Sequence, residues 1–193
     1  SCGVFQPGSL YLAQTEAREH QLRLQEAKAR FYGLNFHEIS REQAKELHPL
    51  ANFDDVRCIM YEPDGGNVDP SGVPHAYAAG ARAMGATIER FCPVIGTDQQ
   101  PDGSWIVRTE KGDIHTQWVV NAAGLWGREV AALAGLTLPL QPTEHQYFVT
   151  ESIDEVANLG RRLPSIADRD GEYYFRQEGN GLLIGAYEKD MKF

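Results

Sequence analysis

Cysteine is scarce in this sequence, which excludes several classes of protein. The 193 residues hold three cysteines, Cys2, Cys58 and Cys92, which are odd in number and widely spaced. A disulfide-stapled scaffold needs a higher density of paired cysteines, and a structural zinc site needs closely spaced Cys or His pairs. No C-x-x-C or H-x-x-x-H pair occurs. We therefore expect reduced thiols and no metal site.

Basic residues and long apolar runs are also in short supply. Lys and Arg number 18 against 27 Asp and Glu, which gives a net charge of -9. An acidic chain with scattered basic residues is not expected to bind nucleic acid or anionic membranes. No apolar run approaches the roughly 20 residues of a membrane span, and the first residues lack a signal-peptide pattern. The sequence therefore predicts a cytoplasmic protein, or a mitochondrial-matrix protein in a eukaryote.

The first third of the chain predicts a strand, two helices and a second strand. The segment GSLYLAQ alternates weakly, so a strand starts near Gly8. The helix that follows ends at Gly33 and has apolar positions at spacings of three and four: Ala13, Ala17, His20, Leu24, Ala27 and Phe31. Ser40 and Gln43 form a capping box for a short helix that Pro49 ends. The segment RCIMYE is typical of a strand.

The middle of the chain begins with a boundary and a third helix. Residues 63–74 are rich in proline and glycine, and they form the clearest boundary in the chain. A helix then runs to Met84 and is capped by Gly85. Its start lies either at 69–70 or at 72–74, and the proline at the second site favours the later start.

Strand-like segments and tight turns fill most of the remaining chain. From residue 86 to residue 123 the pattern is that of β-strands, with hairpin turns at 102–103 and 111–113. A helix follows at 125–134. After a proline-bounded segment come a strand, HQYFVTE, and a hairpin, EYYFRQEGNGLLIGAYE, that turns at 179–181. The whole pattern is α/β in the middle with mixed or antiparallel strands on both flanks, a mixed α+β arrangement.

One stretch, VVNAAGLWGREVAALAG at 119–135, runs from a β-branched segment through a small-residue turn into an apolar helix. This pattern is typical of a nucleotide-binding turn, whose backbone N–H groups face a phosphate or ribose. Ala122, Gly124 and Gly127 match G-x-G-x-x-G at two of its three glycines. A dinucleotide site would also need an acidic residue for the ribose, for which Glu151 is available. The alternative is a tight turn that uses small residues for packing alone.

This stretch and two others together resemble one family. DGGNVDPSGVPHAYAAGARAMGATI, VVNAAGLWGREVAALAGLTLPLQPTEHQYFVTE and YYFRQEGNGLLIGAYE are similar to the FAD-dependent amine oxidoreductases of the D-amino-acid oxidase superfamily. Within that superfamily they resemble the dimethylglycine and sarcosine dehydrogenase group, in one collinear order over essentially the whole chain. The resemblance implies that the N-A-A-G-x-W turn lies beside the flavin. It also implies that G-x-G-x-x-G belongs to an earlier segment, which this sequence does not contain.

The resemblance implies a partial FAD-binding, doubly wound α/β domain joined to a mixed, largely antiparallel substrate-domain sheet with helices. Residues 1–68 and residues 141–193 would belong to the substrate domain, and residues 69–140 to the FAD-binding domain. We therefore expect an internal fragment of a longer enzyme that is inactive and binds no FAD by itself. We also expect self-association through a sheet edge and apolar face left uncovered beside WVVNAAG.

On the cofactor side, the resemblance suggests four residues that contact FAD. Val94 would pack on the adenosine through its backbone, and Ala123, Gly124 and Trp126 would flank the pyrophosphate and the flavin. The alternative for Val94 is a buried strand residue without any role in binding.

On the substrate side, the resemblance suggests His145 and Tyr174 as catalytic residues. Strand alternation puts Tyr174 and Arg176 on one face, so both can contact one ligand. A guanidinium can grip the carboxylate of an N-methylated glycine, which makes Arg176 the candidate substrate-binding residue. The alternatives are a solvated strand arginine at 176 and a hydrogen-bonded structural histidine at 145.

The resemblance implies hydride transfer from an N-methyl or α carbon of a small amine to FAD, with FAD as the cofactor of the intact protein. Two other functions stay open. One is a non-catalytic interaction or structural module of the same fold. The other is an NAD-binding protein that uses the 122–127 turn and Glu151.

Overall fold

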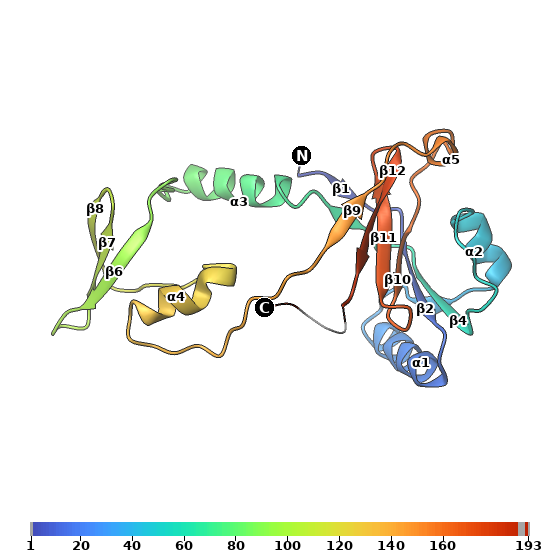
Figure 1. Ribbon diagram of the computed structural model, residues 1–193, viewed down its shortest axis with the longest axis horizontal. Helices are drawn as coiled ribbons and strands as arrows, with labels where there is room; N and C mark the ends of the chain where they lie inside the picture. The colour runs from blue at the N-terminus through green and yellow to red at the C-terminus, as the bar shows by residue number, and fades with distance from the viewer. Residues whose placement is uncertain (1, 189–191, 193) are drawn as a thin grey trace. The chain divides into compact units, whose positions relative to one another are not determined.

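The computed structural model of the chain describes residues 2–188 and residue 192, and it divides into two compact units (Figure 1). Unit 1 contains residues 1–77 and 145–191. Unit 2 contains residues 78–144 and 192–193. The mixture of helices, antiparallel strands and one parallel strand pair confirms the predicted mixed α/β class.

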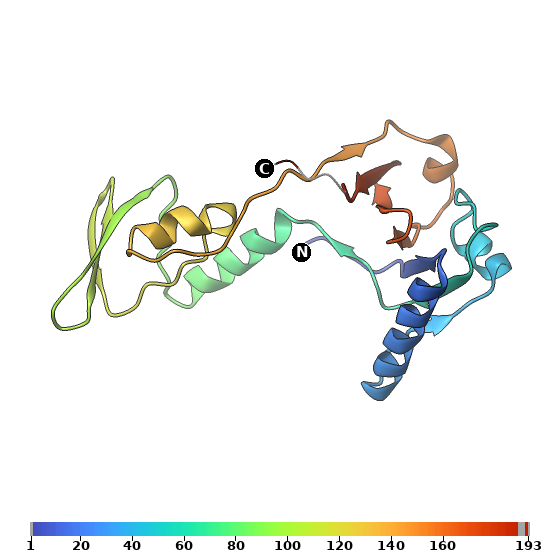
Figure 2. The same ribbon diagram turned by 60° about the horizontal axis from the view of Figure 1, so that its bottom comes forward.

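Unit 1 is built on a seven-stranded sheet (Figures 1 and 2). Its order is β3 (His37–Glu38), β4 (Cys58–Glu62), β2 (Ser9–Ala13), β10 (Ser165–Asp168), β11 (Tyr173–Glu178), β12 (Gly181–Ala186) and β9 (Tyr147–Val149). Among these described strands, β2 and β10 pair in parallel and the other neighbours are antiparallel. A separate antiparallel pair joins β1 (Val4–Phe5) to β5 (Asn67–Val68).

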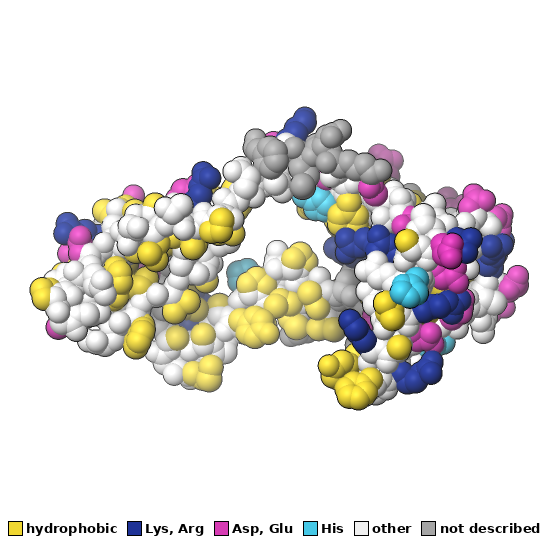
Figure 3. Space-filling view, turned by 90° about the horizontal axis from the view of Figure 1, so that it is seen from below, with side chains coloured by type: hydrophobic (Ala, Val, Ile, Leu, Met, Phe, Trp, Pro, Cys, Tyr) yellow, Lys and Arg dark blue, Asp and Glu magenta, His cyan; other side chains and the backbone are white. Residues whose placement is uncertain are grey.

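Unit 2 holds a three-stranded antiparallel sheet, the second half of helix α3 (Gly72–Ala83) and a short helix, α4 (Gly127–Ala132). The strands are β6 (Val94–Gln99), β7 (Trp105–Thr109) and β8 (Gly112–Thr116), joined by the two predicted hairpins. A 3-10 turn, η1 (Gly124–Trp126), leads into α4, so the predicted helix at 125–134 is shorter than expected. Apolar side chains lie open on the surface of this unit (Figure 3).

Two predicted strands of unit 2 are wrong. Residues 86–91 and residues 118–122 form no strand, and neither belongs to any sheet of the described chain. A strand needs a neighbour that receives its backbone hydrogen bonds, and no described segment pairs with residues 118–122. The side chains of Trp118 and Val120 are consequently 85% and 86% exposed.

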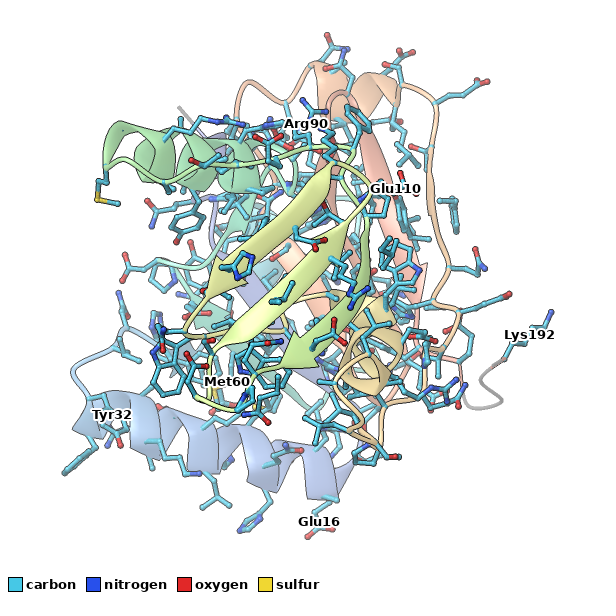
Figure 4. The ribbon with its side chains drawn as sticks, turned by 90° about the vertical axis from the view of Figure 1, so that its left-hand side faces the viewer. Glu16, Tyr32, Met60, Arg90, Glu110 and Lys192 are labelled. Carbon is cyan, nitrogen blue, oxygen red and sulfur yellow. The ribbon has the colours of Figure 1, made fainter. Side chains whose placement is uncertain are left out.

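The core of unit 1 lies on both faces of its sheet, because side chains alternate along each strand. One face packs against helix α2 (Arg41–Leu47), through Leu10, Leu12, Ala44, Phe53, Val56, Ile59 and Ile166. The other packs against helix α1 (Glu16–Phe31), through Ala13, Leu22, Cys58 and Met60. Figure 4 shows α1 between the labelled Glu16 and Tyr32, with Met60 on the side of the sheet that the helix covers.

The start of α1 is held by Asp170, which lies in the turn between β10 and β11. Its carboxylate accepts hydrogen bonds from the backbone N–H of Gln14 (2.8 Å) and of Thr15 (2.9 Å), and Arg18 Nε lies 3.4 Å away. Partial burial alone would raise the pKa of Asp170, but these hydrogen bonds outweigh it and hold that pKa below its usual value. The Thr15 hydroxyl also accepts the Arg18 N–H as N-cap.

The predicted buried stripe of α1 is wrong. Leu24 and Phe31 are 51% and 83% exposed, whereas Leu22 and Ala29 are buried. Ala13, the first residue of that stripe, belongs to β2. The rotation of the helix follows from its anchored start and from Leu22, not from the number of apolar residues on each face.

The predicted starts of α2 and α3, and the glycines predicted to end α1 and α3, are confirmed. In α2 the Gln43 N–H donates to Ser40 Oγ and the Ser40 N–H donates to Gln43 Oε1, so the capping box is complete. Helix α3 (Gly72–Ala83) takes the later of the two predicted starts. Positive φ angles at Gly33 (71°) and Gly85 (94°) fit the predicted helix ends.

Five short elements were not predicted: β1, β3, β5, β10 and α5 (Asp154–Ala157). Segments of two to four residues carry too little periodicity for a prediction. The strand β10 forms because it pairs with β11, which follows it closely, and with β2, which lies in a distant part of the sequence.

His48 is the unusual residue of the core. It is 1% exposed, its ring lies edge-on to Phe175 at 5.2 Å, and neither ring nitrogen has a hydrogen-bond partner in the part of the chain that the structure describes. Burial, with a smaller contribution from the charge of Arg161, lowers the pKa of His48 from 6.5 to about 4. The folded protein therefore holds this ring neutral.

We expect His48 to make the chain less stable in mild acid. The unfolded chain takes up a proton below pH 6.5 and the folded chain only near pH 4, so stability is full above 6.5 and falls as the pH drops. Between pH 7 and pH 5 the loss from this group is about 2 kcal/mol. Urea unfolding of the wild type and of His48→Leu at both pH values measures it. An equal acid loss in both proteins would contradict the assignment.

Candidate active site

Three aromatic side chains from separate segments of unit 1 meet at one place on the sheet. His145 lies just before β9, Tyr174 in β11 and Tyr187 just after β12. The His145 ring stacks on Tyr174 (centroids 6.1 Å apart, planes at 27°) and on Tyr187 (5.6 Å, 24°). The two tyrosine rings are 5.3 Å apart. The structure therefore brings together the two residues that the sequence suggested as catalytic, and it adds Tyr187.

The register of β12 explains this meeting. Gly185 lies opposite Tyr174 of β11 on one side and opposite Tyr147 of β9 on the other. Continued two residues past this pair, the same antiparallel register sets Tyr187 beside His145. A Cβ at Gly185 would lie 2.3 Å from Cζ of Tyr174, so the tyrosine ring rests on the bare glycine backbone.

Two charged side chains flank the rings. Oε2 of Glu188 lies 3.3 Å from Nδ1 of His145, and its Oε1 accepts the backbone N–H of Gln146 at 3.3 Å. The backbone N–H groups of Glu188 itself and of Gln146 hold the pKa of the Glu188 carboxyl below its usual value. The guanidinium of Arg169 lies 4.4 Å from the centre of the Tyr187 ring.

Arg176 lies on the same face of β11 as Tyr174, two residues further along the strand. It lines a pocket of about 480 Å³ within unit 1. Other residues of this pocket are Phe5, Asn67, Asp69, Val149, Arg162 and Leu183. The Arg176 guanidinium forms an ion pair with Glu178, and that of Arg162 lies 3.7 Å from the centre of the Phe5 ring. Two guanidinium groups beside apolar side chains suit a small carboxylate that carries methyl groups.

The turn suggested for cofactor binding lies in unit 2 and is fixed by Asn121. Oδ1 of Asn121 accepts the Ala123 N–H at 3.2 Å, and Nδ2 donates to the Gly127 carbonyl at 2.8 Å. Gly124 has a φ of 58°, which favours glycine, and no atom lies within 4 Å of the position that its Cβ would take. The backbone is therefore open to close approach by a ligand.

The side chains at this turn fit a nucleotide cofactor with a flat ring. Trp126 is largely exposed and follows Gly124 by two residues. Val94, the fourth suggested residue, starts β6 in the same unit and is half-exposed, so the alternative of a buried strand residue does not describe it. An exposed indole two residues from an open glycine backbone suits contact with such a ring.

Four residues of this cluster were not predicted from the sequence: Arg169, Gly185, Tyr187 and Glu188. The signal for Gly185 was present, because a two-residue turn at 179–180 pairs residue 178 with 181 and therefore 174 with 185. The other three depend on the pairing of β9 with β12 and on a turn beside β10, for which the sequence holds no local signal.

Other chemistries lack support in the residues described. No group of three His, Cys, Asp or Glu side chains among them could hold a metal ion. Burial raises the pKa of the Cys58 thiol to about 11, which makes it a poor nucleophile at neutral pH. No described helix is both long and apolar enough to cross a membrane.

Comparison with protein families gives one match that spans the chain. The family model described as FAD dependent oxidoreductase matches residues 1–193. Among solved structures, L-proline dehydrogenase from P. horikoshii superposes with a TM-score of 0.84 at 28% identity, over 95% of this chain and 49% of that one.

Curated relatives are several times longer than this chain. Mitochondrial dimethylglycine dehydrogenase of Mus musculus is 42% identical over 190 residues, 98% of this chain and 22% of the relative. Mitochondrial sarcosine dehydrogenase of Homo sapiens is 34% identical over 196 residues, covering 99% of this chain and 21% of the relative. The mitochondrial pyruvate dehydrogenase phosphatase regulatory subunit of Mus musculus is 33% identical over 192 residues, covering 98% and 22%.

We expect Gly185→Ala to displace the Tyr174 ring, because the added methyl group would overlap it. Crowding of this kind costs about 1–3 kcal/mol. Urea unfolding measures the loss, and near-UV circular dichroism reports the disturbed ring stack. Gly96→Ala is the matched strand control, since its Cβ would meet only Arg108 side-chain carbons at 3.6 Å or more. Equal stability and equal spectra for the two variants would contradict the expectation.

Proposed function

The chain belongs to the family of FAD-dependent oxidoreductases, and from this premise we propose that the whole protein oxidises a secondary or tertiary N-methyl amino acid of the dimethylglycine or sarcosine type. The observation that carries the proposal is the stack of His145 on Tyr174, on the same sheet face as the Arg176 pocket. The 42% identity to a dimethylglycine dehydrogenase over nearly the whole chain supports the choice of substrate class.

In this proposal the two units have different tasks. The turn at 121–127 and Val94 in unit 2 contact FAD, which accepts a hydride from the substrate when it is bound. Ala123, Gly124 and Trp126 supply the open backbone and the exposed indole for that contact. The strands β9, β11 and β12 of unit 1 bind and orient the amine.

In this proposal Arg176 binds the carboxylate of the substrate. Its guanidinium already shares one nitrogen, Nη1, with Glu178. A guanidinium offers five N–H donors in a planar fork, so it can bind a second carboxylate without releasing the first. Val149 and Leu183 in the same pocket provide apolar contacts for N-methyl groups.

His145 accepts the proton of the substrate ammonium, because a neutral amine is the form that can lose a hydride. Histidine suits this task near neutral pH, and its ring is held in place by the stack with Tyr174 and Tyr187. The Tyr174 hydroxyl orients the amine from the same face of the sheet.

A non-catalytic module of the same fold is the second candidate. One relative of similar identity carries the name of a regulatory subunit, not that of a dehydrogenase. Under this alternative the whole protein would bind its partner without reducing flavin when amines are added. The NAD-binding alternative is set aside, since the family is FAD-dependent.

The relatives with mitochondrial names support a mitochondrial-matrix location for the protein in a eukaryotic cell. The cytoplasmic location expected in a bacterium rests on the sequence alone. Both compartments keep thiols reduced, which fits the free Cys2, Cys58 and Cys92.

We expect His145→Ala and Tyr174→Phe to lower kcat/KM of the whole protein for dimethylglycine by about 100-fold each, the low end for a positioned proton-handling group. Flavin content should stay unchanged. Arg176→Lys should raise KM more than it lowers kcat, because a point charge replaces a fork. Steady-state kinetics with dimethylglycine and sarcosine measure all three.

Tyr173→Phe is the matched control, because Tyr173 precedes Tyr174 and points to the opposite face of β11. It should keep wild-type kinetics. Wild-type rates for both His145→Ala and Tyr174→Phe would remove these residues from the site, and a lack of amine-dependent flavin reduction in the wild type would favour the regulatory alternative.

We further propose that the chain self-associates through the apolar surface of unit 2 beside residues 118–122. Trp118 and Val120 are among its most exposed side chains, and exposed apolar surface of this kind promotes association. The 21.5 kDa chain should therefore show a larger mass in light scattering, and Val120→Lys should reduce it. The control variant Leu24→Lys, on the exposed side of α1 in unit 1, should leave the mass unchanged. A monomer at high concentration would refute the proposal.

A further inference from the structure

Glu188 holds two groups of the segment that leads into β9. Its two carboxylate oxygens lie 3.3 Å from Nδ1 of His145 and 3.3 Å from the backbone nitrogen of Gln146. The carboxylate therefore restrains both the ring and the main chain beside it. Glu188 follows β12, whose pairing with β9 already sets the two segments side by side.

The chemistry of this contact determines which ring nitrogen carries the hydrogen. An ionised carboxylate only accepts hydrogen bonds, so Nδ1 of His145 must be the donor. The low pKa of the Glu188 carboxyl keeps it ionised at neutral pH. In the neutral imidazole the other nitrogen, Nε2, is then unprotonated and free to accept a proton.

The other groups that face the ring do not compete for Nδ1. Tyr174 and Tyr187 contact the ring by stacking, with planes at 27° and 24°. The charge of Arg169 lies over the Tyr187 ring and has no contact with His145 among those the structure records. Glu188 is thus the charged partner of His145 in the described residues.

We propose that Glu188 is a positioning residue for His145, which holds the ring with Nδ1 protonated so that Nε2 faces the substrate amine as the proton acceptor. This inference rests on the proposed function of His145. Glu188 touches neither substrate nor cofactor in this proposal, and its effect on the reaction passes through the imidazole.

The first test needs no activity. Nitrogen-15 NMR of the 193-residue chain with labelled histidine reports the tautomer of the neutral His145 ring. The wild type should show Nδ1 protonated and Nε2 bare, and Glu188→Ala should show a mixture. Glu188→Gln keeps the shape of the side chain but accepts only one of the two N–H groups, so it should also lose the single tautomer. Glu155→Gln, exposed on α5, is the control and should match the wild type.

The second test is a double-mutant cycle in the whole protein. Glu188→Ala should slow amine-dependent flavin reduction about 10-fold, a coupling within the range for residues in direct contact. In a His145→Ala background the same substitution should have no further effect. Flavin content and melting temperature show whether each variant folds, and Glu188→Gln replaces Glu188→Ala if it does not.

The outcomes separate the two proposals. If His145→Ala keeps the wild-type rate, the proposed function of His145 fails. If His145→Ala is slow but Glu188→Ala and Glu188→Gln are as fast as the wild type, only the role of Glu188 fails. An unchanged His145 tautomer in both Glu188 variants, or equal effects of Glu188→Ala in the two backgrounds, would likewise overturn the positioning role.

Discussion

The pairing of β12 with both β11 and β9 is the constraint on which the candidate site depends. One residue of β12, Gly185, lies between Tyr174 and Tyr147, and its bare backbone gives the Tyr174 ring its place. That register brings the rings of His145 and Tyr174 together. It also sets the positions of Tyr187 and Glu188 beside His145. Arg176 lies on the same face because strand side chains alternate. A shift of one residue in this pairing would send every one of these strand side chains to the other face.

Local signals in the sequence predicted the elements whose ends are marked by caps and turns. The capping box at Ser40 and Gln43, the late start of α3 and the hairpin turns of β6, β7, β11 and β12 are short-range features, and the structure has them all. The failures are long-range. The rotation of α1 depends on Asp170, and residues 118–122 find no partner strand among the described segments, so neither could be derived from periodicity.

The residues of the candidate site likewise divide into those that the sequence suggested and those that depend on long-range pairing. His145 and Tyr174 were suggested by family resemblance, and the structure places their rings in contact, although their roles remain proposals. Tyr187 and Glu188 could not be predicted from the sequence, because β9 and β12 are separated by some 30 residues and no local pattern sets their pairing. Three of the four suggested cofactor residues, Ala123, Gly124 and Trp126, lie on a turn whose geometry follows from Asn121 and Gly124, two residues already present in the quoted motif.

The anchor at Asp170 also has a consequence for synthesis on the ribosome. The backbone of Thr15 donates to a carboxylate 155 residues further along the chain, and the parallel neighbour of β2 is the similarly distant β10. At typical translation rates, about 8–30 s pass between the emergence of these two parts. During that interval β2 has β4 on one side and an open edge on the other. An open strand edge of this kind can pair with another chain, and the five-residue length of β2 limits that hazard until β10 has been synthesised.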